Sequence, residues 1–271
     1  MPFADLHTHT HYSDGALSPA DLVGRARAAG VGVLAVTDHD TLDGLPEAVE
    51  AGRRAGVEIV PGAELSITVG EQEVHLLALG VDPGHAGLRA HVEHFRTVRE
   101  DRARAMAERL REAGVAVTFE AILAHAGKGV IGRPHVARAV VDAGGAETYN
   151  DAFDRFLREG APAYVGKERF DGRDAIRLVH AAGGLAVVAH AAMLPDDTAL
   201  EALMRQGLDG VEVVHPAHNW AAQRHLAAYA RRYGLLETGG SDYHGHRPGD
   251  DARLGRYGVD ADGLGGLRRA A

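Results

Sequence analysis

Short apolar runs rich in β-branched residues alternate with longer stretches of helical periodicity along most of the chain. The apolar runs cover residues 31–36, 57–60, 74–79, 185–189 and 210–214. Segments 19–29 and 45–55 have helical spacing, and Ser18 followed by Pro19 marks a helix start. Repeated strand–helix units of this length are typical of an α/β fold with a parallel sheet, closed or open. We therefore predict a (β/α) barrel-like fold.

The alternation stops after residue 81 and resumes near residue 164. Between these points, helical patterns cover residues 88–113, 119–126, 136–143 and 150–158. We predict an all-helical insertion at residues 84–164, within a barrel built from residues 1–83 and 165–271.

The composition is rich in histidine and lacks cysteine. The 271 residues include 17 His and no Cys, which excludes disulfides, thiolate metal sites and cysteine nucleophiles. A net charge of −9 argues against electrostatic binding of nucleic acid by the protein as a whole. The insertion differs, with 12 Lys and Arg against 11 Asp and Glu, so it is the place to look for anion recognition. A solvated helix face with pairs such as Glu100 and Arg104 explains much of this charge.

The chain also lacks the sequence signals of membrane proteins. No apolar stretch approaches the roughly 18–20 residues that span a bilayer. The first seven residues lack the basic and apolar regions of a secretory signal. We expect a cytoplasmic protein with no membrane association, no stable nucleic-acid complex and no obligate protein partner.

Histidine and acidic residues cluster where the predicted strands end. His7 and His9 are two positions apart, so a strand directs both side chains to one face. The remaining candidates follow later strands, except for one at the start of its strand; they are Asp14, His39, Glu64, His75, His190, Asp242 and His244. In a β/α barrel, functional groups from several strands meet at the C-terminal rim. The pattern therefore predicts one site assembled from distant parts of the chain.

These nine candidates, six imidazoles and three carboxylates, exceed what one metal ion can coordinate. A carboxylate can bridge two ions, and Glu64 is the natural bridge. Imidazole and carboxylate donors without thiolates suit manganese, zinc or iron. We predict two to three divalent ions per chain, with Mn²⁺ as the first choice and Fe²⁺ or Zn²⁺ as alternatives.

Several polar residues also have a local explanation. Asp14 could form a turn with Gly15, and we expect Asp38 to cap the segment after it rather than bind metal. His11 and His246 continue the motif pattern but are expected to lie outside the ligand set.

The predicted helix near Arg133 is the clearest anion site in the insertion. Arg133 precedes Pro134 in its first turn, where free backbone N–H groups beside an arginine can bind phosphate. An ordinary helix start with an exposed arginine explains the same residues equally well. Nearer the predicted rim, His215 and His218 are candidates for contact with substrate.

The ordered motifs resemble those of the polymerase and histidinol phosphatase (PHP) family. They read D-L-H-T-H-T-H-Y-S-D-G, T-D-H-D-T, P-G-A-E, H-L-L, A-H and G-S-D-Y-H-G. The resemblance covers residues 1–82 and 165–250 and implies a distorted (β/α)7 barrel that binds up to three metal ions. Within the family, G-R-P-H at residues 132–135 and the Arg-rich helix resemble stand-alone nucleoside 3′,5′-bisphosphate phosphatases and 5′-to-3′ exoribonucleases.

The resemblance also implies which residues act together. Three ions would be held by His7, His9, Glu64 and Asp242; by Glu64, His75 and His190; and by Asp14, His39 and His244. A metal-bound hydroxide, held through Glu64 and Asp242, would be the nucleophile. The expected substrate contacts are Asp14, Arg99, Arg102, Arg133, His135, Lys167 and His218. Many relatives have Pro-Gly where this chain has Ala191 and Ala192, so we expect a different loop there.

We therefore expect a metal-dependent phosphoric ester hydrolase without a protein nucleophile. The expected reactions convert a nucleoside 3′,5′-bisphosphate to the 5′-monophosphate plus phosphate, shorten 5′-phosphorylated RNA in the 5′-to-3′ direction, or both. Histidinol-phosphate phosphatase is an alternative, because an acidic rim would suit its cationic substrate. A DNA-processing accessory role and a non-catalytic PHP interaction module are the others, although such modules typically lose ligands that this chain keeps.

Overall fold

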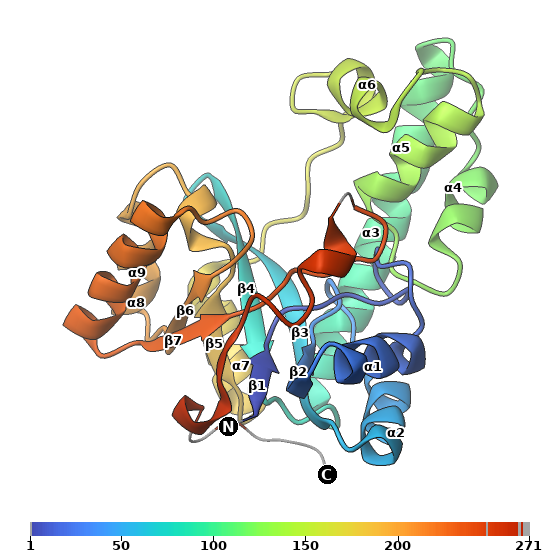
Figure 1. The fold of residues 1–271 in the computed structure, drawn as a ribbon. Coiled ribbons are helices and arrows are strands. Elements are labelled where there is room, and N and C mark those ends of the chain that lie inside the picture. The colour runs from blue at the N-terminus through green and yellow to red at the C-terminus, as the bar shows by residue number, and fades with distance from the viewer. Residues whose placement is uncertain (1, 248, 265–266, 268–271) are drawn as a thin grey trace. The chain divides into compact units, whose positions relative to one another are not determined.

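The computed structural model describes residues 2–247, 249–264 and 267. The chain separates into two compact units (Figure 1). Unit 1 comprises residues 1–91 and 169–271, and unit 2 comprises Val92–Glu168. The insertion predicted at residues 84–164 falls on the same part of the chain as unit 2, with slightly earlier boundaries.

Unit 1 contains the strands and five of the helices that the described residues form. The strands are β1 (Phe3–Asp5), β2 (Val31–Val36), β3 (Glu58–Val69), β4 (Gln72–Leu79), β5 (Leu185–Val188), β6 (Gly210–Val214), β7 (Leu236–Gly239) and β8 (Val259–Asp260). The helices are α1 (Pro19–Ala28), α2 (Leu45–Ala55), α7 (Gly172–Ala181), α8 (Thr198–Arg205) and α9 (Trp220–Tyr233). Short 3₁₀ turns occupy Ala191–Met193, Asp250–Ala252 and Ala261–Gly263.

The remaining helices lie wholly or mostly in unit 2. They are α3 (Ala86–Glu112), α4 (Phe119–Ala126), α5 (Arg133–Asp142) and α6 (Tyr149–Ala152), followed by a π-helical turn at Phe153–Leu157. Among the described residues, none of the helices combines the length and the apolar character needed to cross a bilayer.

The strands form one sheet in the order β7-β6-β5-β4-β3-β2-β1-β8. The backbone N–H of Leu6 donates to the carbonyl of Gly239 (3.1 Å), so the chain after β1 also meets the end of β7. The sheet therefore curls into a nearly closed barrel. In unit 1, α1 and α2 pack beside β2 and β3, and α9 packs against β6 and β7 (Figure 1).

The strand–helix alternation predicts a parallel sheet, and β4 and β8 are the strands that depart from it. β4 runs antiparallel to both β3 and β5, and β8 runs antiparallel to β1. The predicted run 57–60 continues as β3 to Val69, and only Gly70 and Glu71 separate it from β4. Gly70 has a φ of 60°, which suits a tight hairpin. With no helix between the two strands, the chain cannot return to the start of the sheet, so β4 must reverse direction.

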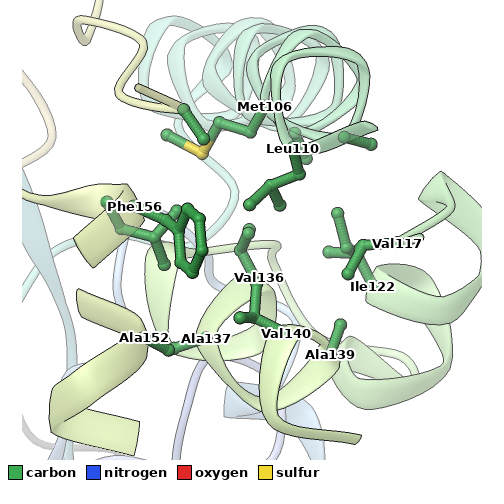
Figure 2. Close-up of a cluster of buried hydrophobic side chains, with 14 of the residues drawn as sticks. Met106, Leu110, Val117, Ile122, Val136, Ala137, Ala139, Val140, Ala152 and Phe156 are labelled. Carbon is green, nitrogen blue, oxygen red and sulfur yellow. The ribbon is translucent and has the colours of Figure 1, made fainter. Parts of the chain in front are cut away.

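Each unit has its own apolar core. In unit 1, fully buried side chains such as Leu6, Val60 and Leu77 fill the barrel. In unit 2, Met106 and Leu110 of α3 face Val136 of α5, with further side chains from α4 and the π-helical turn (Figure 2). A contiguous apolar cluster therefore connects the helices of unit 2.

Candidate metal centre

The candidate ligands of unit 1 converge on the buried carboxylate of Glu64. Its Oε2 lies 3.1 Å from His7 Nε2, 3.2 Å from His9 Nε2 and 3.2 Å from His39 Nδ1. β1 ends at Asp5, so His7 and His9 lie on the segment just after the strand rather than within it. That segment continues beside the chain that follows β7, where the backbone N–H of His9 donates to the carbonyl of Tyr243 (2.9 Å), and both imidazoles reach the same oxygen of Glu64.

The second oxygen of Glu64 meets two more imidazoles. Oε1 lies 2.7 Å from His75 Nδ1 and 3.0 Å from His190 Nε2. His75 comes early in β4, although the predicted site lies where the strands end. Because β4 is antiparallel to its neighbours, its N-terminal half lies at the edge where the parallel strands end.

Asp242 and Asp14 complete the cluster. Asp242 Oδ1 lies 3.3 Å from His9 Nε2 and 3.5 Å from His244 Nδ1. Asp14 Oδ1 lies 3.2 Å from His244 Nε2 and 3.9 Å from His39 Nε2. The structure thus brings all nine predicted ligands into one cluster within unit 1.

Backbone strain marks the same region. Among the described residues other than glycine, only Asp40, His190 and Asp242 have positive φ, at 49°, 33° and 48°. Such conformations cost about 1–3 kcal/mol each and concentrate at functional sites. Two of the three are predicted metal ligands, which indicates that the surrounding structure forces these side chains into the cluster.

The electrostatics of the cluster require positive charge. Burial would raise the pKa of Glu64, but the neighbouring His39 and His7 rings outweigh burial and lower it well below its usual value. The pKa values of Asp14 and Asp242 are lowered in the same way, against the effect of burial, by nearby histidines. Three buried carboxylates are therefore ionised together, and protonated histidines such as His9, whose pKa the carboxylates raise to about 9, balance their charge until metal ions replace those protons.

The donor set fits divalent metal ions. His9 Nε2, Asp14 Oδ1, His39 Nδ1 and His215 Nε2 are buried and make no hydrogen bond. Ligand atoms lie within 4.8 Å of one another in four groups, namely His9, Asp14, His39 and His244; His7, His9 and Glu64; His39, Glu64 and His75; and His7, His215 and Asp242. Buried, unpaired nitrogen and oxygen atoms pointing at one another are what a metal centre provides before its ions bind. These groups overlap the three predicted ligand sets without reproducing them, so the division among ions stays a prediction.

Sequence reasoning missed two residues that contact this cluster. Glu212, in β6, is fully buried, and its Oε1 lies 3.1 Å from His7 Nδ1. Arg247 donates from Nη1 to Asp242 Oδ2 (2.8 Å). A single acid inside the apolar run G-V-E-V-V was the available signal for Glu212. Nothing in the local sequence distinguishes Arg247 from other surface arginines.

His215 was considered only as a substrate contact, but it lies against the metal ligands. Its Nε2 is 3.6 Å from Asp242 Oδ2, and its ring is buried. Nδ1 accepts the backbone N–H of Ala217 (3.1 Å), so in the neutral ring the proton is on Nε2. At 3.6 Å this nitrogen makes no hydrogen bond to Asp242, and it could coordinate an ion only after losing that proton.

Asp38 does not cap the segment after it, contrary to prediction. Its carboxylate accepts the N–H and hydroxyl of Thr10 (both 2.7 Å) and the hydroxyl of Ser13 (2.6 Å). These contacts fix the loop between His9 and Asp14. The prediction was wrong because a capping residue bonds to the segment that directly follows it, whereas the hydrogen-bond partners of Asp38 lie far earlier in the chain.

His218 is held by hydrogen bonds within the chain. Nδ1 donates to the carbonyl of Val213 (2.9 Å), and Nε2 accepts the N–H of Ala192 (3.2 Å). The unusual Ala191-Ala192 sequence therefore forms a 3₁₀ turn that is tied to the loop after β6. Since both ring nitrogens of His218 are engaged, a role in substrate contact would require these bonds to break.

The expected phosphate contacts of unit 2 lie around the start of α5 and the end of the unit. Arg99 Nη1 donates to the carbonyl of Ile131 (3.3 Å), which places its guanidinium beside the residues that precede Arg133. His135 is buried, and its Nδ1 accepts the N–H of Gly132 (3.0 Å). Arg102 Nε donates to the carbonyl of Val165 (2.8 Å), two residues before Lys167.

A nearly closed α/β barrel with imidazole and carboxylate groups gathered at one edge is the architecture of a metal-dependent hydrolase. A model of the PHP domain family matches residues 5–162. The chain is 36% identical over 259 residues to a 3′,5′-nucleoside bisphosphate phosphatase of Chromobacterium violaceum, covering 93% of this chain and 90% of that protein. It is 35% identical over 251 residues to a 5′-3′ exoribonuclease of Haemophilus influenzae, covering 89% of each.

A solved structure from Bifidobacterium adolescentis, described as a metal-dependent phosphoesterase, matches with a TM-score of 0.88 at 34% identity. The match covers 98% of this chain and 95% of that chain. The chain therefore belongs to the PHP domain family, and it is a phosphoester hydrolase of the metal-dependent type.

Proposed function

We propose that the metal centre of unit 1 hydrolyses phosphate esters of nucleotides. The first proposed substrate is a nucleoside 3′,5′-bisphosphate, converted to the 5′-monophosphate and phosphate. Removal of nucleotides from the 5′ end of short phosphorylated RNA is the second proposed activity of the same centre. The observation that carries the proposal is the convergence of five imidazoles on the two oxygens of Glu64. The activities of the two curated relatives support the choice of substrates.

We propose two to three ions, Mn²⁺ first and Fe²⁺ or Zn²⁺ as alternatives, held by the nine predicted ligands with Glu64 as the bridge. When bound, such cations would lower the pKa of a coordinated water and neutralise charge on the phosphate oxygens. The chain has no cysteine to act as a nucleophile. In the proposed reaction, the oxygen of a water molecule bonds to phosphorus, the ester P–O bond breaks, and a proton released by that water ends on the departing alcohol.

The contacts around the cluster hold the candidate metal ligands in a fixed arrangement. Glu64 and the bonds that Asp38 makes to Thr10 and Ser13 immobilise the ligands on both sides of the loop after β1. Arg247 places a permanent positive charge 2.8 Å from Asp242. Preorganised charges of this kind stabilise a transition state without rearranging during the reaction.

We further propose that unit 2 recognises a second, non-reacting phosphate. Arg133 lies in the first turn of α5, and the Arg99 guanidinium is bonded to Ile131 just before it. Backbone N–H groups at a helix start and arginine side chains both favour a phosphate ligand. A nucleoside 3′,5′-bisphosphate and the end of a 5′-phosphorylated RNA each carry a phosphate besides the one that reacts.

Metal analysis and a phosphate-release panel test these proposals together. The panel contains a 3′,5′-bisphosphate, short 5′-phosphorylated RNA and histidinol phosphate, each with the Mn²⁺-loaded protein and the chelated protein. We expect two to three bound ions and fastest turnover on the bisphosphate, abolished by chelation. Fastest turnover on histidinol phosphate would reject the nucleotide assignment. Tight metal binding with no turnover on any of the three would favour a non-catalytic module.

A further inference from the structure

Glu212 occupies a position from which it contacts two candidate metal ligands at once. It lies in β6 and is fully buried. Oε1 lies 3.1 Å from His7 Nδ1, and Oε2 accepts the backbone N–H of His190 at 2.6 Å. Both carboxylate oxygens are therefore engaged, and Glu212 belongs to none of the groups of side chains that could hold an ion within the part of the chain that the structure describes.

The contact with His7 determines which ring nitrogen is available to a metal. An ionised carboxylate only accepts hydrogen bonds, so Nδ1 of His7 must carry the proton. In the neutral ring, Nε2 then has a lone pair, and it faces Glu64 Oε2 at 3.1 Å and Asp242 Oδ1 at 3.5 Å. A lone pair facing two carboxylate oxygens is repulsive, so either a proton or a metal cation must lie among them. The hydrogen bond to Glu212 thus prepares His7 for coordination through Nε2.

The contact with His190 fixes a strained backbone. His190 has a φ of 33°, a conformation that non-glycine residues rarely adopt. The hydrogen bond from its N–H to Glu212 stabilises this conformation, from which Nε2 of His190 reaches Glu64 Oε1 at 3.0 Å. One buried carboxylate therefore orients two ligands that meet opposite oxygens of Glu64.

We propose that Glu212 is a positioning residue that sets the ring tautomer of His7 and the backbone of His190 for metal binding. This inference rests on the proposed metal-dependent function. Carboxylates that orient ligating histidines typically change metal affinity by 10–100-fold when they are replaced. If Glu212 served only to pack the barrel, its replacement would lower the stability of the protein and leave the metal affinity of the folded form unchanged.

The variant Glu212→Gln isolates the hydrogen bonds, because it keeps the size of the side chain. Both partners of Glu212 are N–H donors, whereas an amide offers only one acceptor oxygen. Either His7 loses its proton from Nδ1 and is protonated on Nε2, or the N–H of His190 loses its acceptor. The variant cannot satisfy both contacts while His7 keeps its proton on Nδ1.

Calorimetric titration of the chelated protein with Mn²⁺ measures the effect. We expect the ions that His7 and His190 coordinate to bind about 10–100-fold more weakly in Glu212→Gln, with the remaining ion nearly unaffected. Glu237→Gln is the matched control: it lies in the adjacent strand β7, is partly exposed and pairs with Arg231 at 3.7 Å. Unchanged affinities in a folded Glu212→Gln variant would overturn the inference. A wild-type protein that binds no metal would instead overturn the proposed function.

A second measurement does not depend on the variant being folded. In the wild-type protein loaded with diamagnetic Zn²⁺, nitrogen-15 NMR distinguishes the ring nitrogens of histidine. We expect His7 to be protonated on Nδ1 and coordinated through Nε2, with the Nδ1 proton protected from exchange. Coordination through Nδ1 would contradict the inference whatever the variant does.

Discussion

At the scale of single residues, Glu64 explains most of the order in the metal centre. Each of its oxygens is close to ring nitrogens from different strands and loops, so its position couples ligands that are distant in sequence. A carboxylate buried among neutral imidazoles alone would be unstable. The arrangement is therefore consistent with cations as a structural part of the site as well as a chemical one.

Glu64→Gln removes the proposed bridge while preserving the size of the side chain. We expect metal content to fall by at least one ion per chain and kcat/KM to fall by at least about 100-fold, because metal stabilisation of the transition state is worth several kcal/mol. Elemental analysis and phosphate release measure the two effects. Glu237→Gln, which changes a partly exposed carboxylate in β7, should change neither. Full metal content in Glu64→Gln would reject the bridging role.

Metal affinity should decrease as pH falls. Burial lowers the pKa of His9, but Asp242 and Glu64 outweigh burial and raise the pKa to about 9 in the absence of metal. Protons on such rings must leave before the nitrogen can coordinate, so protons compete with the ion increasingly below that value. We expect Mn²⁺ affinity and turnover to decline from about pH 8 to 5.5, a range that includes the reference histidine pKa of about 6.5. Calorimetric titration with Mn²⁺ at several pH values measures the affinity. A constant affinity across the range would contradict the competition between protons and the ion.

At the scale of elements, local sequence predicts those whose limits are set locally. The predicted bounds match β2, α2, α4 and β6, because glycine, proline or capping residues adjoin these periodic segments. The length of β3 was not predictable, since Pro61 and Gly62 interrupt its pattern and the pairing with β4 extends it. Glu212 and Arg247 were missed for a related reason: their partners lie far away in sequence, and no local pattern records such contacts.

Two glycines on different elements should respond oppositely to alanine. A Cβ at Gly240, after β7, would lie 2.3 Å from His7 Cβ, so His7 or the barrel closure must shift. A Cβ at Gly24 in α1 has open space. We expect Gly240→Ala to lower the free energy of unfolding by at least about 1–3 kcal/mol and to weaken metal binding. Gly24→Ala should raise the free energy of unfolding by about 0.5–1 kcal/mol.

Denaturant unfolding of the chelated proteins checks both variants, and metal titration checks the ligand effect. Gly24→Ala also serves as a control for substitution of glycine in unit 1. Equal stability of the two variants would mean that the close approach of Gly240 to His7 is not needed for the fold.

At the scale of the whole molecule, the division into two units allows metal binding and substrate recognition to be tested by separate substitutions. The candidate ligands lie in unit 1, whereas Arg99, Arg102, Arg133, His135 and Lys167 belong to unit 2. Each unit has its own buried core. A substitution on the surface of unit 2 should therefore leave metal content unchanged, and any change in rate then reports on substrate recognition rather than on the metal centre.

Arg133→Ala tests whether unit 2 binds the reacting or the non-reacting phosphate of the substrate. If Arg133 binds a phosphate that does not react, its loss removes a charge-assisted contact worth about 1.5–3 kcal/mol. We expect kcat/KM for a 3′,5′-bisphosphate to fall by roughly ten- to more than a hundredfold. A monophosphate, which has only its reacting group, should be affected little. The control is Arg155→Ala, a half-exposed arginine in the same unit that pairs with Asp151 at 3.1 Å. Equal losses on the two substrates would place Arg133 on the reacting phosphate or in the scaffold, and would make histidinol phosphate the better candidate.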